Sequence, residues 1–246
     1  LMGLIRYSGF FINTPVFSES IIPMRSKAGL ALGCTLITLP HLIATHELPT
    51  LSIAGYGLVA IRELVLGFSI GYMVLVVMAC MRLGGQIIGM QIGFSFVQVA
   101  DPTSNQSLGI VGEFFQMIAT LVFLVIGGHL LLLQTFFQSF DMVPLNGLVL
   151  TSGIVEETML YTRVIFISGL QIAMPIIGVI LIGDVALGII ARTVPKLNIF
   201  QVGFSLKILS GLMILIWLMP MLGDLINRLL HLSIGQVNTI LGQMAS

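Results

Sequence analysis

Long apolar runs are the feature that most constrains how this chain can fold. The runs alternate with short polar segments, and each is about as long as the roughly 20 residues that a helix needs to cross the hydrocarbon core of a bilayer. They cover residues 28–45, 64–81, 114–133, 164–183 and 199–222. No stretch shows the strict alternation of apolar and polar residues that is typical of a half-buried strand. The sequence therefore predicts an all-α fold.

Charged residues are scarce in this sequence. Of its 246 residues, 8% are charged and 57% are hydrophobic, with ten basic and ten acidic side chains. An ordinary soluble domain carries about 25% charged residues, so a soluble monomer of this size is excluded. The same composition excludes a disordered chain and a nucleic-acid binder that acts through a basic face. We expect the surface to meet membrane lipid, other protein chains, or both.

Several charges interrupt the apolar runs. Asp184 divides an otherwise continuous stretch and Lys207 lies inside the last run, although a charge at the bilayer centre costs about 2.5–3.5 kcal/mol. Pro175 is expected to kink or break its helix. We therefore expect helical hairpins that pack against other helices as much as against lipid, in a single domain over residues 1–246. Because the chain opens on Leu1, we also expect that part of the native N-terminus is missing.

Glycines recur at helical spacing in two segments. Gly67 and Gly71 are four residues apart, and Gly85, Gly89 and Gly93 repeat this spacing. On a helix such a series forms a bare ridge that another backbone can approach closely. We interpret both series as helix-packing surfaces. The alternative is that glycine is simply frequent in apolar segments of this kind.

Motifs for catalysis are weak in this sequence. A G-x-S-x-G pattern surrounds Ser69 and His129 is a candidate base, but that motif needs a strand, a sharp turn and a helix. The histidines lack metal-ligand spacing, and no P-loop pattern occurs. Cys34 and Cys80 lie in apolar stretches and are interpreted as small buried hydrophobic residues. The sequence predicts no enzyme, no cofactor and no metal site.

The window over residues 91–115 is the most unusual part of the chain. A glycine-bearing helix leads into a polar turn at Asp101 and Pro102, and Ser107 restarts a helix. Non-helical backbone between membrane helices is tolerated where it is buried in protein or lines a watery cavity. The window is therefore either a pore-lining or occluding loop, or an ordinary turn outside the membrane. Arg82 and Glu113 flank it and are a candidate ion pair across the hairpin, the alternative being separate contacts with solvent or partners.

Four blocks of sequence carry a family resemblance. They are TPVFSESIIPMRSKAGLALG (14–33), GGQIIGMQIGFSFVQVADPTSNQS (84–107), LVFLVIGGHLLLL (121–133) and DVALGIIARTVPKLNIFQVGFSLKI (184–208). With these blocks the chain resembles the FliR/SctT family of export-gate proteins of flagella and type III secretion systems. It departs from the family pattern at Gly128, where asparagine is frequent, and at Ser205, where proline is frequent.

The resemblance implies a non-enzymatic core subunit of a flagellar protein export gate. Such a subunit would assemble with FliP-type and FliQ-type subunits into a closed channel for unfolded flagellar export substrates, and an FlhB-type switch subunit would contact the assembly. It implies a multi-pass protein of the bacterial inner membrane within the flagellar basal body. The family's plug loop maps onto Phe94, Ser95, Phe96, Val97, Asp101, Pro102, Thr103, Ser104, Asn105, Gln106 and Ser107.

Other functions stay open on the sequence alone. The chain is compatible with an injectisome subunit of the SctT type. It is also compatible with an ion-coupled transporter whose broken helix at Pro175 and Asp184 forms a midplane site. An intramembrane hydrolase using Ser69 is a third alternative.

Overall fold

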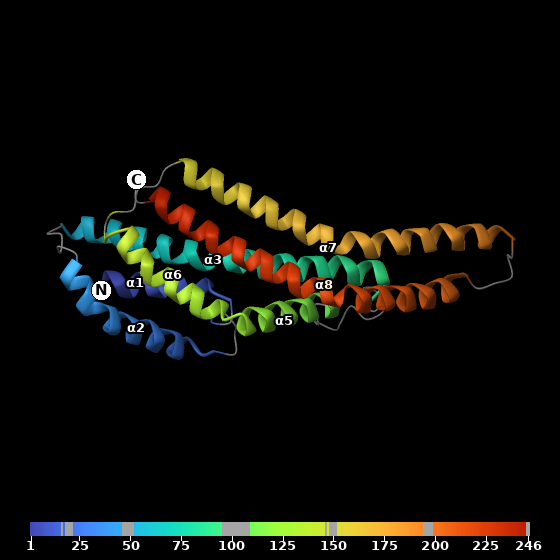
Figure 1. The fold of residues 1–246 in the computed structure, drawn as a ribbon, viewed down its shortest axis with the longest axis horizontal. Helices are drawn as coiled ribbons and strands as arrows, with labels where there is room; N and C mark the ends of the chain where they lie inside the picture. The colour runs from blue at the N-terminus through green and yellow to red at the C-terminus, as the bar shows by residue number, and fades with distance from the viewer. Residues whose placement is uncertain are drawn as a thin grey trace. The chain divides into compact units, whose positions relative to one another are not determined.

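The computed structural model of the protein describes residues 1–15, 17, 22–45, 52–94, 109–145, 147, 152–193 and 199–244 (Figure 1). These residues form seven α-helices and no strand, which confirms the predicted all-α class. The helices, labelled as in Figure 1, are α1 (Met2–Asn13), α2 (Met24–Thr45), α3 (Ile53–Ile92), α5 (Ile110–Val125), α6 (Gly128–Met142), α7 (Ser152–Thr193) and α8 (Ile199–Met244).

The chain continues as one helix in one of the apolar runs and is divided between two helices in another. Helix α7 continues through Pro175, so of the two expected effects, a kink or a break, the break does not occur. A proline removes one backbone hydrogen bond, and the helical hydrogen bonds on either side keep the segment in register. The run over residues 114–133, in contrast, is divided between α5 and α6. Gly127 adopts a left-handed conformation with a φ of +70°, which glycine tolerates because it has no Cβ atom.

The helices confirm the predicted multi-pass membrane character. Among the described residues, α2, α3, α7 and α8 are each long and apolar enough to cross a membrane. The broken pair α5 and α6 adds a fifth crossing if the two helices together form one span. The apolar runs predict five or six crossings, and the run over residues 114–133 is the one that the break before α6 divides.

The chain divides into two compact units. Unit 1 consists of Leu1–Val77, Phe123–Thr162 and Arg228–Ser246, and unit 2 consists of Met78–Val122 and Arg163–Asn227. Unit 1 thus contains α1, α2, α6 and one part each of α3, α7 and α8. Unit 2 contains most of α5 and the other parts of the same three long helices.

Aromatic side chains hold α1 against α6 in unit 1. The rings of Tyr7 and Phe10 each lie 4.5 Å, centroid to centroid, from the ring of Phe136. All three are fully buried, as is nearby Phe140. Burying a phenylalanine side chain contributes about 1.5–3 kcal/mol, so this cluster anchors the first helix of the chain.

Helices α7 and α8 pair in an antiparallel manner within each unit. In unit 1, Tyr161 and Ser233 share a buried hydroxyl contact of 2.6 Å, and the Gln236 amide donates to Glu157 at 3.0 Å. In unit 2, Lys207 Nζ lies 2.8 Å from the Asp184 carboxylate.

Candidate functional site

The predicted plug loop lies outside the described residues, with the exception of Phe94. That residue lies two positions after the end of α3 and is half-buried. What the structure describes is the pair of helices on either side of the loop, α3 and α5. The contact between these two helices is therefore the candidate site.

Helices α3 and α5 approach each other at the level of their backbones. A methyl group at Gly85 would lie 2.7 Å from the carbonyl oxygen of Val111 and 2.8 Å from Cα of Gly112. Cβ atoms in proteins essentially never come within 3.0 Å of such atoms, so a side chain at position 85 would push the helices apart. One turn later, a methyl group at Gly89 would make an ordinary contact of 3.4 Å with the Val111 side chain.

The last glycine of this series has a different role. Gly93 follows the end of α3 with a φ of +103°, in a region that side chains disfavour. A Cβ atom there would also lie 3.1 Å from the ring of Phe204 on α8. Gly93 thus ends α3 by its conformation, in the manner of a C-terminal glycine cap, while Gly85 serves close packing.

Arg82 and Glu113 meet at the same contact. The Arg82 guanidinium donates a hydrogen bond to the Glu113 carboxylate and forms an ion pair between α3 and α5. Both side chains are about half exposed, and an exposed ion pair contributes only about 0–1 kcal/mol. The close contact at Gly85, rather than this ion pair, therefore contributes most to the stability of the packing between α3 and α5.

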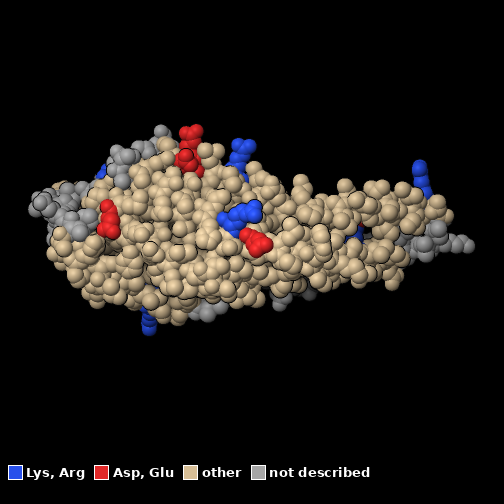
Figure 2. Space-filling view, in the orientation of Figure 1, with Lys and Arg blue, Asp and Glu red and all other residues tan. Residues whose placement is uncertain are grey.

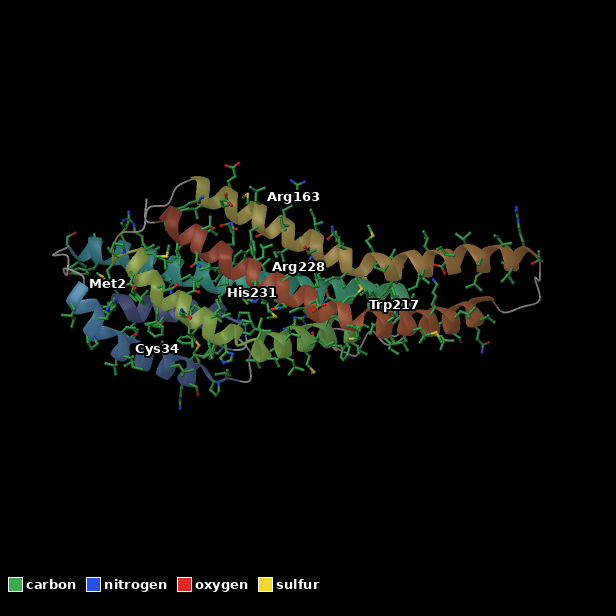
Figure 3. All side chains as sticks on the ribbon, in the orientation of Figure 1. Met2, Cys34, Arg163, Trp217, Arg228 and His231 are labelled. Carbon is green, nitrogen blue, oxygen red and sulfur yellow. The ribbon has the colours of Figure 1, made fainter. Side chains whose placement is uncertain are left out.

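Helix α3 is packed equally closely on a second side in unit 2. A methyl group at Gly84 would lie 2.8 Å from the carbonyl oxygen of Gly169 on α7, and one at Gly169 would lie 2.9 Å from that of Cys80. The Cys80 thiol donates to the Ile165 carbonyl oxygen at 3.0 Å. Cys80 is a small buried residue, as predicted, whereas Cys34, which is labelled on α2 in Figure 3, is only partly buried.

The earlier glycine series contacts α1 in unit 1. A methyl group at Gly67 would lie 2.0 Å from the carbonyl oxygen of Arg6. A methyl group at Gly9 on α1 would lie 2.4 Å from the carbonyl oxygen of Leu64. At Gly71 the nearest atom is Thr14 Oγ1, at 3.0 Å. The closest approach of the two helices therefore lies between Gly9 and Gly67.

A buried ion pair between Arg6 and Glu63 was missed by the sequence reasoning. The side chains are 0% and 1% exposed, and Arg6 Nε lies 2.5 Å from Glu63 Oε2. The signal was present, because Glu63, Gly67 and Gly71 follow one another at intervals of four residues and so share one face of a helix. A charged side chain on the same helix face as a series of glycines indicates that the helix packed against that face carries a side chain of opposite charge.

Ser69 and Asp184, which the hydrolase and transporter alternatives would use, are engaged in other contacts. Ser69 lies within the uninterrupted helix α3 and donates its hydroxyl hydrogen to the Val65 carbonyl oxygen at 2.8 Å. This helix is not the strand, turn and helix that a nucleophilic serine elbow requires. His129 is half-buried at the N-terminal end of α6. Asp184 is held in its ion pair with Lys207.

Much of the apolar surface of the long helices is not covered by the chain itself. In the most apolar windows, 22% of the residues are buried in α2, 33% in α7 and 17% in α8. Ile216 and Trp217 on α8 are 70% and 74% exposed, and Figure 3 labels the tryptophan. On the face drawn in Figure 2, charged side chains are few and scattered.

Fold and surface together define a multi-pass helical membrane protein with apolar faces left for lipid or further chains. A family model described as "Bacterial export proteins, family 1" matches residues 1–233. The chain therefore belongs to this family of bacterial export proteins.

Relatives with curated names are similar to nearly the whole chain. The Flagellar biosynthetic protein FliR of Escherichia coli (strain K12) is 32% identical over 226 residues, covering 92% of this chain and 86% of the relative. The protein of the same name from Pectobacterium carotovorum subsp. carotovorum is 32% identical over 242 residues, covering 98% and 92%. That from Bacillus subtilis (strain 168) is 30% identical over 247 residues, covering 98% and 93%.

Proposed function

We propose that this chain is a non-enzymatic core subunit of the flagellar protein export gate. It forms the closed secretion channel with FliP-type and FliQ-type subunits in the bacterial inner membrane, within the flagellar basal body. An FlhB-type switch subunit contacts it, and unfolded flagellar proteins are its cargo. The observation that carries this proposal is the family match over residues 1–233, together with relatives named as flagellar biosynthetic proteins.

The surface of the helices supports assembly with other chains. Exposed large apolar side chains follow α2, α7 and α8, and only a minority of the residues in their apolar windows is buried by this chain. Contiguous apolar surface of this extent marks protein or membrane contacts. The close glycine contacts support a rigid framework, because backbones that touch leave little room for sliding.

Co-purification tests the proposal directly. A tagged chain is expressed together with FliP-type and FliQ-type subunits, and the purified material is weighed by native mass spectrometry. We expect one stable assembly that contains all three kinds of subunit. A chain that purifies alone as a stable, monodisperse protein in the presence of these subunits would contradict the proposal.

The loop after α3 is proposed to be the plug of this channel. Deleting residues 101–107 is expected to make cells leak ions when the whole gate is produced, because the obstruction would be shortened while the helices around it remain. Ion flux is measured with an ion-sensitive dye in intact cells. The same deletion without the partner subunits is the control and should cause no leak. Unchanged ion flux in the complete gate would argue against an occluding role.

The ion pair between Arg82 on α3 and Glu113 on α5 gives a second prediction. Arg82→Glu or Glu113→Arg alone would place like charges between α3 and α5, and each is expected to reduce secretion of flagellar substrates into the medium. Combining the two restores opposite charges and should recover most of the loss. Because the pair is half exposed, we expect partial rather than complete defects. A double variant as defective as the worse single variant would show that the ion pair between these two side chains does not support secretion.

A further inference from the structure

The buried side chain of Arg6 does more than balance the charge of Glu63. Its Nη1 donates to the carbonyl oxygen of Ser139 at 3.0 Å and approaches Ser139 Oγ at 3.4 Å, and its Nη2 donates to the carbonyl oxygen of Val143 at 3.1 Å. The guanidinium carbon lies 4.3 Å from the ring centroid of Phe140. One side chain on α1 thus reaches both α3 and the end of α6.

Both acceptors lie at the C-terminal end of α6: the Val143 carbonyl oxygen belongs to the C-cap residue, and the Ser139 carbonyl oxygen accepts Arg6 as a second donor beside the Val143 amide at 3.0 Å. Helix α6 ends at Met142, with Val143 as its C-cap residue. The last carbonyl groups of a helix have no amide donors further along the same helix, and the C-terminal end carries partial negative charge. A guanidinium placed there satisfies both needs, and its planar fork reaches two carbonyl oxygens at once.

Two features keep this cation in place. Gly67 allows α3 to touch the Arg6 backbone, and Glu63, one turn earlier on α3, then lies beside the Arg6 side chain. A buried cation is costly unless it is paired. The neighbouring Tyr7 does not supply negative charge, because burial raises the pKa of its phenol to about 12. Glu63 is the acidic side chain that holds Arg6.

We infer that Arg6 is the C-terminal cap of α6, supplied from another helix, and that Glu63 is its positioning partner. The pair ties α1, α3 and α6 together at one point, and the turn that begins at Val143 is anchored by it. This inference concerns unit 1 alone and does not depend on the proposed export function. In a simple ion pair Arg6 would only balance the charge of Glu63, whereas a capping Arg6 also donates hydrogen bonds to the end of α6.

A charge swap distinguishes a cap from a simple ion pair. In the double variant R6E/E63R the two charges are still opposite, but a carboxylate now faces the carbonyl oxygens of Ser139 and Val143. Hydrogen–deuterium exchange of the full chain in detergent, read from peptides over residues 138–145, reports on the end of α6. We expect exchange there to be about tenfold faster in the swapped variant, in line with the loss of hydrogen bonds to a charged group. Native exchange rates in this variant would overturn the inference.

A second variant answers the same question if the swapped protein does not accumulate. R6M/E63L replaces the pair by apolar side chains, a change that folded proteins often accept. The end of α6 should again exchange about tenfold faster, while peptides from the middle of α3 keep their native exchange. The swap R82E/E113R at the exposed ion pair is the matched control and should leave residues 138–145 unchanged. Native exchange at the end of α6 in R6M/E63L would likewise overturn the inference.

Discussion

Replacing Gly67 with alanine is expected to lower the free energy of unfolding by about 3 kcal/mol, the upper end of the usual cost of overpacking. The added methyl group would lie 2.0 Å from the Arg6 carbonyl oxygen and 3.0 Å from the Phe10 amide nitrogen. Both neighbours are backbone atoms, so no flexible side chain can move aside, and α1 must shift away from α3. Denaturant unfolding of the purified chain in detergent, followed by circular dichroism, measures the loss.

Gly57→Ala is the matched control, because Gly57 lies on the same helix. A methyl group there meets no described atom within 4 Å outside the backbone of its own helix. Alanine is a better helix former than glycine by about 1 kcal/mol, so this variant should be as stable as the native chain or slightly more stable. Equal losses in the two variants would mean that glycine flexibility, rather than close packing with α1, explains position 67.

The second large effect is expected at Gly85. Gly85→Ala places a methyl group 2.7 Å from the Val111 carbonyl oxygen and against the backbone of Gly112. We expect a loss of about 2–3 kcal/mol in the free energy of unfolding. If the proposed function holds, secretion of flagellar substrates should fall with it, because α3 and α5 lie on either side of the proposed plug segment in the chain. Unfolding and secretion are measured on the same variant.

Gly89→Ala, one turn further along α3, tests whether the loss at Gly85 comes from the close contact with α5 or from replacing a glycine as such. The new methyl group would make an ordinary 3.4 Å contact with the Val111 side chain, so we expect a change within about 1 kcal/mol and normal secretion. Both positions carry glycine in the same series, and only the distance to α5 differs. A loss at Gly89 as large as that at Gly85 would show that the contact geometry is not the cause.

The two glycine contacts also account for the arrangement of charges. Close approach at Gly67 brings Arg6 beside Glu63, and close approach at Gly85 brings Arg82 beside Glu113. In each case the charged residue lies three or four positions from the glycine, which is the spacing of neighbours on one helix face. The buried pair orders three helices, whereas the exposed pair has little energetic weight.

The sequence by itself determined the helical class, the membrane character and the family. These follow from quantities that are local along the chain, namely the length of each apolar run, the scarcity of charge and short motifs. It also marked the glycine series and named Arg82 and Glu113 as a pair that the structure brings together. The plug loop stays a prediction, because its residues other than Phe94 lie outside the described part of the chain.

Only the tertiary structure decided which helix each glycine series meets. It assigned Gly67 to α1 and Gly85 to α5, kept α7 continuous through Pro175 and divided the run before α6 at Gly127. It also placed Arg6 against the end of α6, although the two contacting segments are more than 130 residues apart in the chain. The physical reason is that transfer of an apolar run from water depends on its own residues, whereas a contact depends on the geometry of two distant segments at once.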